Sequence, residues 1–374
     1  MADNAWIKRL RQPLGTALMF TASLGISIAY NTYTEHKARI PKHSDLQLKL
    51  DEVARRHASE DELPGFLIRQ RKISLNGSSL LGVSRLRVAP GGGLIVLDTV
   101  GRKIERFSSN GERLGPAGSG ENGTQPGDFM FPSGVDVGAA GMMVADFKQT
   151  RISRLSPQGT FQDSFSTSAE RFSAKSVFAA PHQSDIYVCG NRYMADLATI
   201  HRYSSTGVFE GSLLPLPKWA RPLNLEAFND CLSSTTPQHT LVAFPYEYQV
   251  FDLSGGTAKP LEIEAPAAFH RPAKPLVFAG VDPAKHLAVF EEWKAEWTPI
   301  EAIALVNHDR LLIEYQTYSP LRYTLDVWDL GQQRRVRTLH TNYRLMTAGN
   351  DNRPYFLADG QKENRYELLS GALL

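Results

Sequence analysis

The side chains that most often carry enzyme chemistry are scattered in this sequence. Its ten histidines form no HExxH pair, and the chain contains neither a GxSxG nucleophile motif nor a phosphate-binding glycine loop. The glycine run at 90–93 lies between expected strands and is typical of a turn. Cys189 and Cys231 lack the spacing of a zinc site or a CxxC redox motif. We therefore expect no catalytic residue, no bound metal and no cofactor.

Two cysteines and two charged segments allow more than one interpretation. Cys189 lies in a buried-strand pattern and is expected to be an inert core thiol, with a disulfide to Cys231 as the alternative if the body is exported. Residues 291–297 combine two tryptophans with three carboxylates. They suit a plain surface loop or hairpin, or an aromatic anchor at a protein interface, for which Trp293 and Trp297 are the candidate partner-binding residues. The basic run at 334–337 is expected to be a solvated edge strand.

A repeat of 48 residues must position these side chains. The segment 104–111 recurs at 152–159 and 200–207, and more weakly at 248–255. A hydrophobic strand at 93–98 recurs at 141–146 with the same step. An inner strand precedes it and an outer strand follows, so each unit holds about four strands. Units of this size cannot bury both faces of their sheet alone, and they are typical of the blades of a β-propeller.

The second unit carries a family resemblance. Residues 123–137, 141–146 and 151–161 together resemble an NHL repeat, and the chain as a whole resembles bacterial six-bladed propellers of the NHL-like class. The resemblance implies an aspartate after the second strand of each blade. Asp98 and Asp146 fit this pattern, whereas Gly190 does not. We expect both aspartates to accept backbone N–H groups of the turn that follows.

The same resemblance raises an enzyme alternative. Some members of this class are metal-dependent lyases or lactonases with histidines or carboxylates around the central channel. The inner-strand positions of this chain carry Arg85, Arg87, Val135 and Asp136 instead. Matching metal ligands are therefore missing from the sequence pattern.

The strand count predicts how the ring closes. Runs near 240–253 and 300–340 supply blades four and five, and 344–374 holds three further runs. The segment 66–75 can provide the missing strand and remove an exposed sheet edge. Residues 275–298 do not fit the count and are expected to form an inserted hairpin. We thus expect an all-β, six-bladed propeller over 63–374, with a seven-bladed ring as the alternative.

The N-terminal part differs from the propeller in composition. After a basic tail at 1–12, residues 13–34 are uncharged and long enough for a transmembrane helix or uncleaved signal anchor, with a cleaved signal peptide as the alternative. Gly25 and Ala29, four positions apart, are candidates for contact with another membrane helix. A linker with a short amphipathic helix is expected at 35–62, where Ser44 can cap the helix.

The charge and composition of the chain limit the classes of partner that we expect. Forty-one Lys and Arg oppose thirty-nine Asp and Glu, with no long block of either sign, so no nucleic-acid binding is expected. We expect a non-catalytic scaffold propeller on the periplasmic side of a bacterial inner membrane. Its expected partners are the lipid bilayer and other membrane-protein subunits, as in an accessory subunit of a photosynthetic or respiratory complex. The alternative is a metal-dependent hydrolase or lyase with its site in the central channel.

Overall fold

The computed structural model describes most of the chain after residue 60. The described ranges are 61–76, 80–167, 172–179, 185–192, 198–223, 230–277, 280–282, 285–317, 322–349, 351–358 and 366–374. The tail at 1–12, the expected span at 13–34 with Gly25 and Ala29, and the linker at 35–60 lie outside these ranges. None of the helices within the described ranges is both long and apolar enough to span a bilayer.

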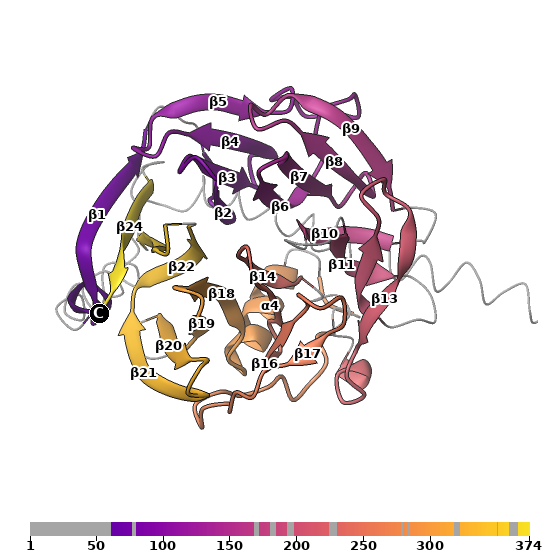
Figure 1. Ribbon diagram of the computed structural model, residues 1–374. Coiled ribbons are helices and arrows are strands. Elements are labelled where there is room, and N and C mark those ends of the chain that lie inside the picture. Colours follow the sequence, from indigo (N-terminus) through magenta and orange to yellow (C-terminus); the bar gives the residue numbers. More distant parts are fainter. Residues whose placement is uncertain are drawn as a thin grey trace, which may run out of the picture.

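Six four-stranded antiparallel sheets surround a central axis (Figure 1). Their strands, from the axis outward, are β2 (Arg85–Val88), β3 (Leu94–Asp98), β4 (Lys103–Phe107) and β5 (Arg113–Ala117) in blade 1; β6 (Pro132–Gly138), β7 (Gly141–Asp146), β8 (Arg151–Leu155) and β9 (Phe161–Ser166) in blade 2; β10 (Phe172–Ala179), β11 (Ile186–Arg192), β12 (Ala198–Tyr203) and β13 (Phe209–Pro215) in blade 3; β14 (Leu232–Thr235), β15 (Thr240–Phe244), β16 (Glu247–Asp252) and β17 (Lys259–Pro260) in blade 4; β18 (Ile300–Val306), β19 (Arg310–Gln316), β20 (Tyr323–Asp329) and β21 (Arg334–Thr341) in blade 5; and β22 (Tyr343–Ala348), β23 (Pro354–Ala358), β24 (Tyr366–Leu373) and β1 (Leu67–Leu75) in blade 6. The prediction of six blades is confirmed, and the seven-bladed alternative is wrong.

Ring closure occurs within blade 6. Its outermost strand β1 comes from the start of the described chain and pairs antiparallel with β24, from Leu67 opposite Leu373 to Leu75 opposite Tyr366. Figure 1 shows the two strands side by side, in indigo and yellow. The short helix α3 (Leu63–Phe66) leads into β1. The prediction that 66–75 completes the last blade is confirmed.

The second strand of a blade is its most apolar strand, because neighbouring blades cover both of its faces. Every residue of β3 is buried, as is every residue of β15. Between blades 1 and 2, buried side chains such as Leu97, Val135 and Val144 form one packed cluster. Continuous apolar runs of this length are typical of strands buried on both faces.

The two repeated aspartates hold the ends of their blades together. Asp98 accepts backbone N–H groups from Leu81, Gly82 and Gly101 at 2.7, 3.2 and 2.6 Å. Asp146 accepts the equivalent groups of Met130, Phe131 and Gln149 at 2.7, 3.1 and 3.2 Å. Each carboxylate thus joins the turn after its strand to the segment that enters the same blade. The predicted structural role of both aspartates is confirmed.

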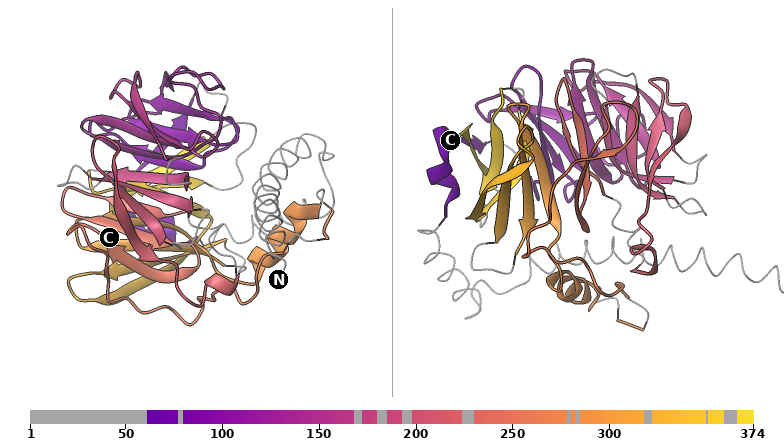
Figure 2. Two further views of the ribbon diagram at one scale, coloured as in Figure 1. Left: turned by 90° about the vertical axis from the view of Figure 1, so that its right-hand side faces the viewer. Right: turned by 60° about the horizontal axis from the view of Figure 1, so that its bottom comes forward.

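The insertion between blades 4 and 5 contains a helix, α4 (His286–Ala295), and not the expected hairpin. Phe290 and Trp293 lie three residues apart in this helix and therefore on the same side of it, and Trp297 follows two residues after the helix ends. All three pack against the core of blades 3 and 4. Figure 2 shows α4 projecting from one face of the disc.

Candidate functional site

One ion pair and one hydrogen bond cross the central channel. The inner strands follow one another around the axis in chain order, so blades 1 and 4 lie on opposite sides of it. The Arg85 guanidinium on β2 lies 2.7 Å from the carboxylate of Asp230, which precedes β14. Arg87, two residues along β2, lies 3.5 Å from Asp136 on β6. Arg87 also donates a 3.0 Å hydrogen bond to the Ser233 hydroxyl on β14.

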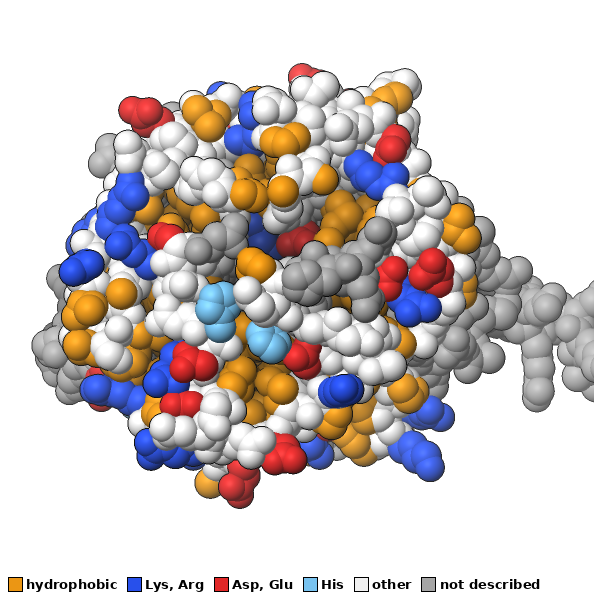
Figure 3. Space-filling model, viewed as in Figure 1, with side chains coloured by type: hydrophobic (Ala, Val, Ile, Leu, Met, Phe, Trp, Pro, Cys, Tyr) orange, Lys and Arg blue, Asp and Glu red, His pale blue; other side chains and the backbone are white. Residues whose placement is uncertain are grey.

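Blade 3 completes this polar cluster. The Ser176 hydroxyl on β10 shares its proton between two acceptors, the backbone oxygen of Cys231 at 3.1 Å and the carboxylate of Asp230. The second oxygen of Asp136 accepts the backbone N–H of Ala179 at 3.0 Å. Residues of blades 1 to 4 are therefore joined to each other across the axis. Figure 3 shows acidic and basic side chains together at the bottom of a central hollow.

Burial sets the electrostatics of the channel. Desolvation lowers the pKa of Arg87, an effect that Asp136 opposes. Desolvation likewise raises the pKa of Asp136, opposed by Arg87. The Lys175 ammonium on β10 has its pKa lowered to about 8 by burial, with Asp230 acting in the other direction. Each charge depends on an oppositely charged neighbour in a setting that penalises isolated charges.

The channel cluster offers carboxylates but no set of metal ligands. Asp136 and Asp230 each face an arginine, and the described residues contain no group of three His, Cys, Asp or Glu side chains arranged to hold a metal ion. Sequence reasoning identified Arg85, Arg87 and Asp136 as inner-strand residues but missed Asp230. Asp230 lies outside the repeated segments, so its position facing the channel becomes visible only once the ring has closed.

The two candidate tryptophans are buried within the chain's own core. Trp293 is 7% exposed and Trp297 is 3% exposed, with ring centroids 5.1 Å apart. The Trp293 indole N–H donates to the backbone oxygen of Lys274 at 2.7 Å. Direct contact with a partner would therefore reach little of either ring. The spacing of Phe290, Trp293 and Trp297 was the sequence signal for this inward-facing arrangement.

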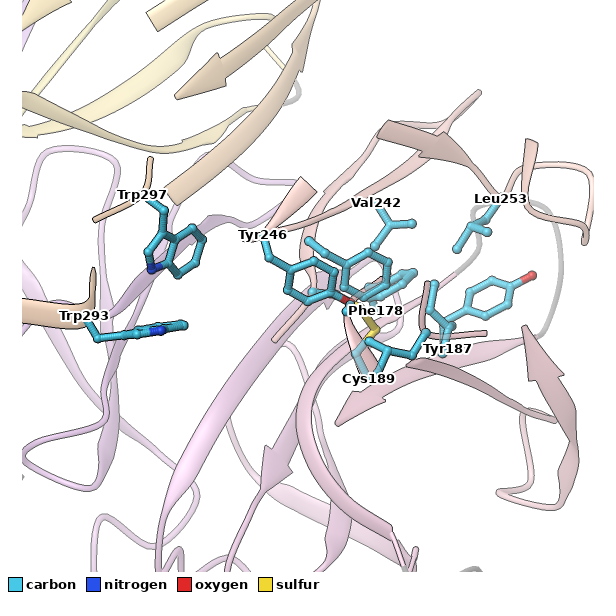
Figure 4. Close-up of a cluster of buried hydrophobic side chains, with 13 residues drawn as sticks. Phe178, Tyr187, Cys189, Val242, Tyr246, Leu253, Trp293 and Trp297 are labelled. Carbon is cyan, nitrogen blue, oxygen red and sulfur yellow. A yellow bond between two sulfur atoms is a disulfide. The ribbon is translucent and has the colours of Figure 1, made fainter. Parts of the chain in front are cut away.

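A disulfide lies in the same core as the tryptophans. Cys189 on β11 is joined to Cys231, and both are buried with Phe178, Phe244 and Tyr246 (Figure 4). The disulfide alternative is thus the arrangement found, and the expectation of a free core thiol is wrong. The bond ties blade 3 to the segment that carries Asp230 into the channel.

The outer side of α4 is polar. Glu292 and Glu296 are exposed, and Glu296 pairs with Lys274 at 3.0 Å. Lys294 pairs with Glu301 at 2.7 Å and so ties the helix to β18. The insertion therefore has charged side chains on its outer side and the aromatic rings of Trp293 and Trp297 on its inner side. Because Gly25 and Ala29 lie outside the described residues, their partner contact stays a prediction.

Comparisons with known proteins show the fold alone. No protein-family model and no curated protein matches the sequence. A protein of Bacteroides fragilis described as a candidate exported protein is 10% identical over 82% of this chain and 95% of its own, with a TM-score of 0.61. A member of the DUF4221 family from Bacteroides vulgatus is 11% identical over 82% of this chain and 97% of its own, with a TM-score of 0.50. A structure of U3-55K is 10% identical over 77% of each chain, with a TM-score of 0.50. The chain is a six-bladed propeller similar to these.

Proposed function

We propose that this protein is a membrane-anchored, non-catalytic propeller that binds another membrane-protein subunit. The observation that carries the proposal is the pairing of Arg85 with Asp230 across the channel. The charged side chains described at the axis form ion pairs with one another. We therefore expect the partner subunit to bind the outer surfaces of the disc. Such a protein could serve as an accessory subunit of a large photosynthetic or respiratory complex. We also propose that its repeats belong to the NHL-like class.

Membrane attachment rests on the uncharged segment 13–34. Its length suits a single span, and it precedes the propeller. The disulfide between Cys189 and Cys231 favours an oxidising compartment, which supports a propeller on the periplasmic side of a bacterial inner membrane. Gly25 and Ala29 are the positions at which a second membrane helix could approach closely.

The α4 insertion is the proposed site of protein contact. It is the part of the described chain that departs most from the repeat, and it projects from the disc (Figure 2). Trp293 and Trp297 fix the insertion to blades 3 and 4, while Glu292 and Glu296 are exposed on its outer side. We assign the direct contact to these carboxylates and the support to the tryptophans.

Purification from native membranes in mild detergent tests this function. The wild-type chain should retain a co-migrating membrane subunit. A Glu292→Lys, Glu296→Lys variant should lose it, whereas Glu112→Lys, Glu121→Lys, which changes one exposed glutamate before β5 and one after it, should keep it. Equal retention by both variants would remove α4 as the contact. A pure protein that carries stoichiometric calcium or zinc would favour the hydrolase or lyase alternative over the scaffold.

A further inference from the structure

The outer strands of blades 5 and 6 form one continuous stretch of the rim. The two residues before helix α3 join them, because the carboxylates of Asp61 and Glu62 accept the backbone N–H groups of Asn342 and His340 at 2.9 and 2.7 Å. The guanidinium of Arg337 on β21 lies 5.1 Å from the centre of the Phe66 ring. Strands β1 and β21 are therefore held next to each other at the edge of the disc (Figure 1).

This part of the rim is basic. Arg69 and Lys72 on β1, and Arg334 and Arg337 on β21, are exposed. We call these four residues the basic rim. Lys72 pairs with Glu367 at 3.4 Å, whereas no ion pair is found for the other three among the described residues. Figure 3 shows basic side chains along the same side of the molecule.

Local geometry turns the basic rim outward. The pairing of β1 with β24 shifts register between Ile68 and Arg71, and Arg69 there has a φ of 51°. A bulge of this kind re-aims the side chain it carries. Ile68 and Val336 are 43% and 41% exposed, which adds apolar contact area between the cations.

We propose that the basic rim binds the anionic headgroups of the bilayer that carries the N-terminal anchor. The proposal rests on the membrane attachment proposed above. Strand β1 is the first strand of the described chain, so the basic rim includes the strand by which the chain enters the propeller after the linker expected at 35–62. Anionic lipid surfaces attract clustered Lys and Arg side chains, and this attraction decays over about 10 Å in ordinary salt. The disc would then stand with this rim toward the membrane.

Energy transfer in lipid nanodiscs tests the basic rim with the full chain. Because Cys189 and Cys231 are joined to each other, a single cysteine introduced as Val336→Cys can carry a fluorescent donor. The acceptor is a headgroup-labelled lipid, in discs of phosphatidylcholine with or without phosphatidylglycerol. Each cation near an anionic surface strengthens association about fivefold, so Arg69→Gln, Arg334→Gln, Arg337→Gln together should weaken docking about a hundredfold.

We expect more transfer in the anionic discs, a fall with added salt, and loss of this excess in the triple variant. Lys148→Gln, Lys218→Gln, Lys259→Gln removes three exposed cations elsewhere and should leave the excess unchanged. Equal transfer in both lipids, or equal loss in both triple variants, overturns the proposal and leaves an acidic protein as the occupant of this surface.

Failure of the membrane anchor gives a different result, because the protein then elutes without discs. Sedimentation with phosphatidylglycerol vesicles decides the proposal in that case. Salt-sensitive binding that the triple variant loses supports the basic rim, and absence of binding overturns it.

Discussion

The guanidinium of Arg85 in blade 1 lies 2.7 Å from the carboxylate of Asp230 on the opposite side of the propeller. Arg85 is 16% exposed and Asp230 is 43% exposed, so solvent weakens the pair without removing it. In a double-mutant cycle with Arg85→Met and Asp230→Asn, we expect a coupling free energy of about 1 kcal/mol from denaturant unfolding.

The pair between Arg353 and Asp351 is the control for this cycle. Its atoms lie 3.8 Å apart, and both side chains are at least a third exposed. We expect its coupling free energy to be close to zero. A cross-channel coupling no larger than this control would show that the polar cluster does not brace the ring.

Loss of the disulfide should lower stability more than loss of an ion pair. The crosslink joins residues separated by 42 positions, and chain entropy predicts a loss of about 4 kcal/mol for Cys189→Ser, Cys231→Ser. The measurement is the free energy of unfolding with and without a reducing agent. Reduced wild-type protein should match the double variant, and an oxidised protein no more stable than the reduced one would contradict the prediction.

Close packing between blades 2 and 3 should make Gly134 intolerant of a side chain. An added Cβ at Gly134 would lie 2.7 Å from the Cα of Ser176 and 2.8 Å from the backbone oxygen of Lys175. Gly134→Ala should lower the free energy of unfolding by about 2 kcal/mol, because backbone atoms must move. Gly138→Ala, at the end of the same strand with nothing within 4 Å of the added atom, should change it little. Equal effects of the two variants would refute this account of the packing.

Glu314 should give the stability a pH dependence. Burial raises the pKa of its carboxyl well above the usual range, although Leu345 donates a backbone N–H to it at 2.5 Å. The raised folded-state pKa means that the stability contributed by the neutral acid is complete below the unfolded-state pKa. That contribution is lost as the pH rises through the folded-state pKa. Unfolding midpoints measured across a range of pH should show this loss in the wild type and not in Glu314→Gln. The same pH dependence in both proteins would contradict the prediction.

Replacing Trp293 or Trp297 with phenylalanine should lower the stability of the protein by different amounts. Trp293 donates to the Lys274 backbone oxygen, while the buried indole nitrogen of Trp297 has no hydrogen-bond partner among the described residues. Trp293→Phe should therefore destabilise the protein about 1 kcal/mol more than Trp297→Phe. Melting temperatures of the two variants provide the measurement. The reverse order would show that the indole groups are satisfied differently.

The repeat made the architecture predictable from the sequence. The strands expected at 93–98 and 141–146 appear at Leu94–Asp98 and Gly141–Asp146. Glycine turns and buried hydrophobic runs depend on the local sequence, so the strands of each blade can be predicted from that blade's own residues. Closure by 66–75 followed from counting strands, because an open ring would leave a sheet edge exposed.

The candidate site was less predictable because it depends on distant contacts. Asp230 meets Arg85 only when blades 1 and 4 face each other, and no local pattern near Asp230 indicates this. The aromatic spacing in α4 was hidden among carboxylates that suggested a loop. Whether Cys189 pairs with Cys231 depends on packing between two blades, which the spacing of the cysteines does not indicate.

The junction of β1 with β24 has a consequence for biogenesis. A ribosome must deliver nearly the whole polypeptide before the first strand can find its partner, since that partner begins at Tyr366. During synthesis, β1 would remain unpaired while the other five blades are made. Nascent chains that stop before Tyr366 would lack β24, the partner of β1. We expect proteases or chaperones to recognise such chains as incompletely folded.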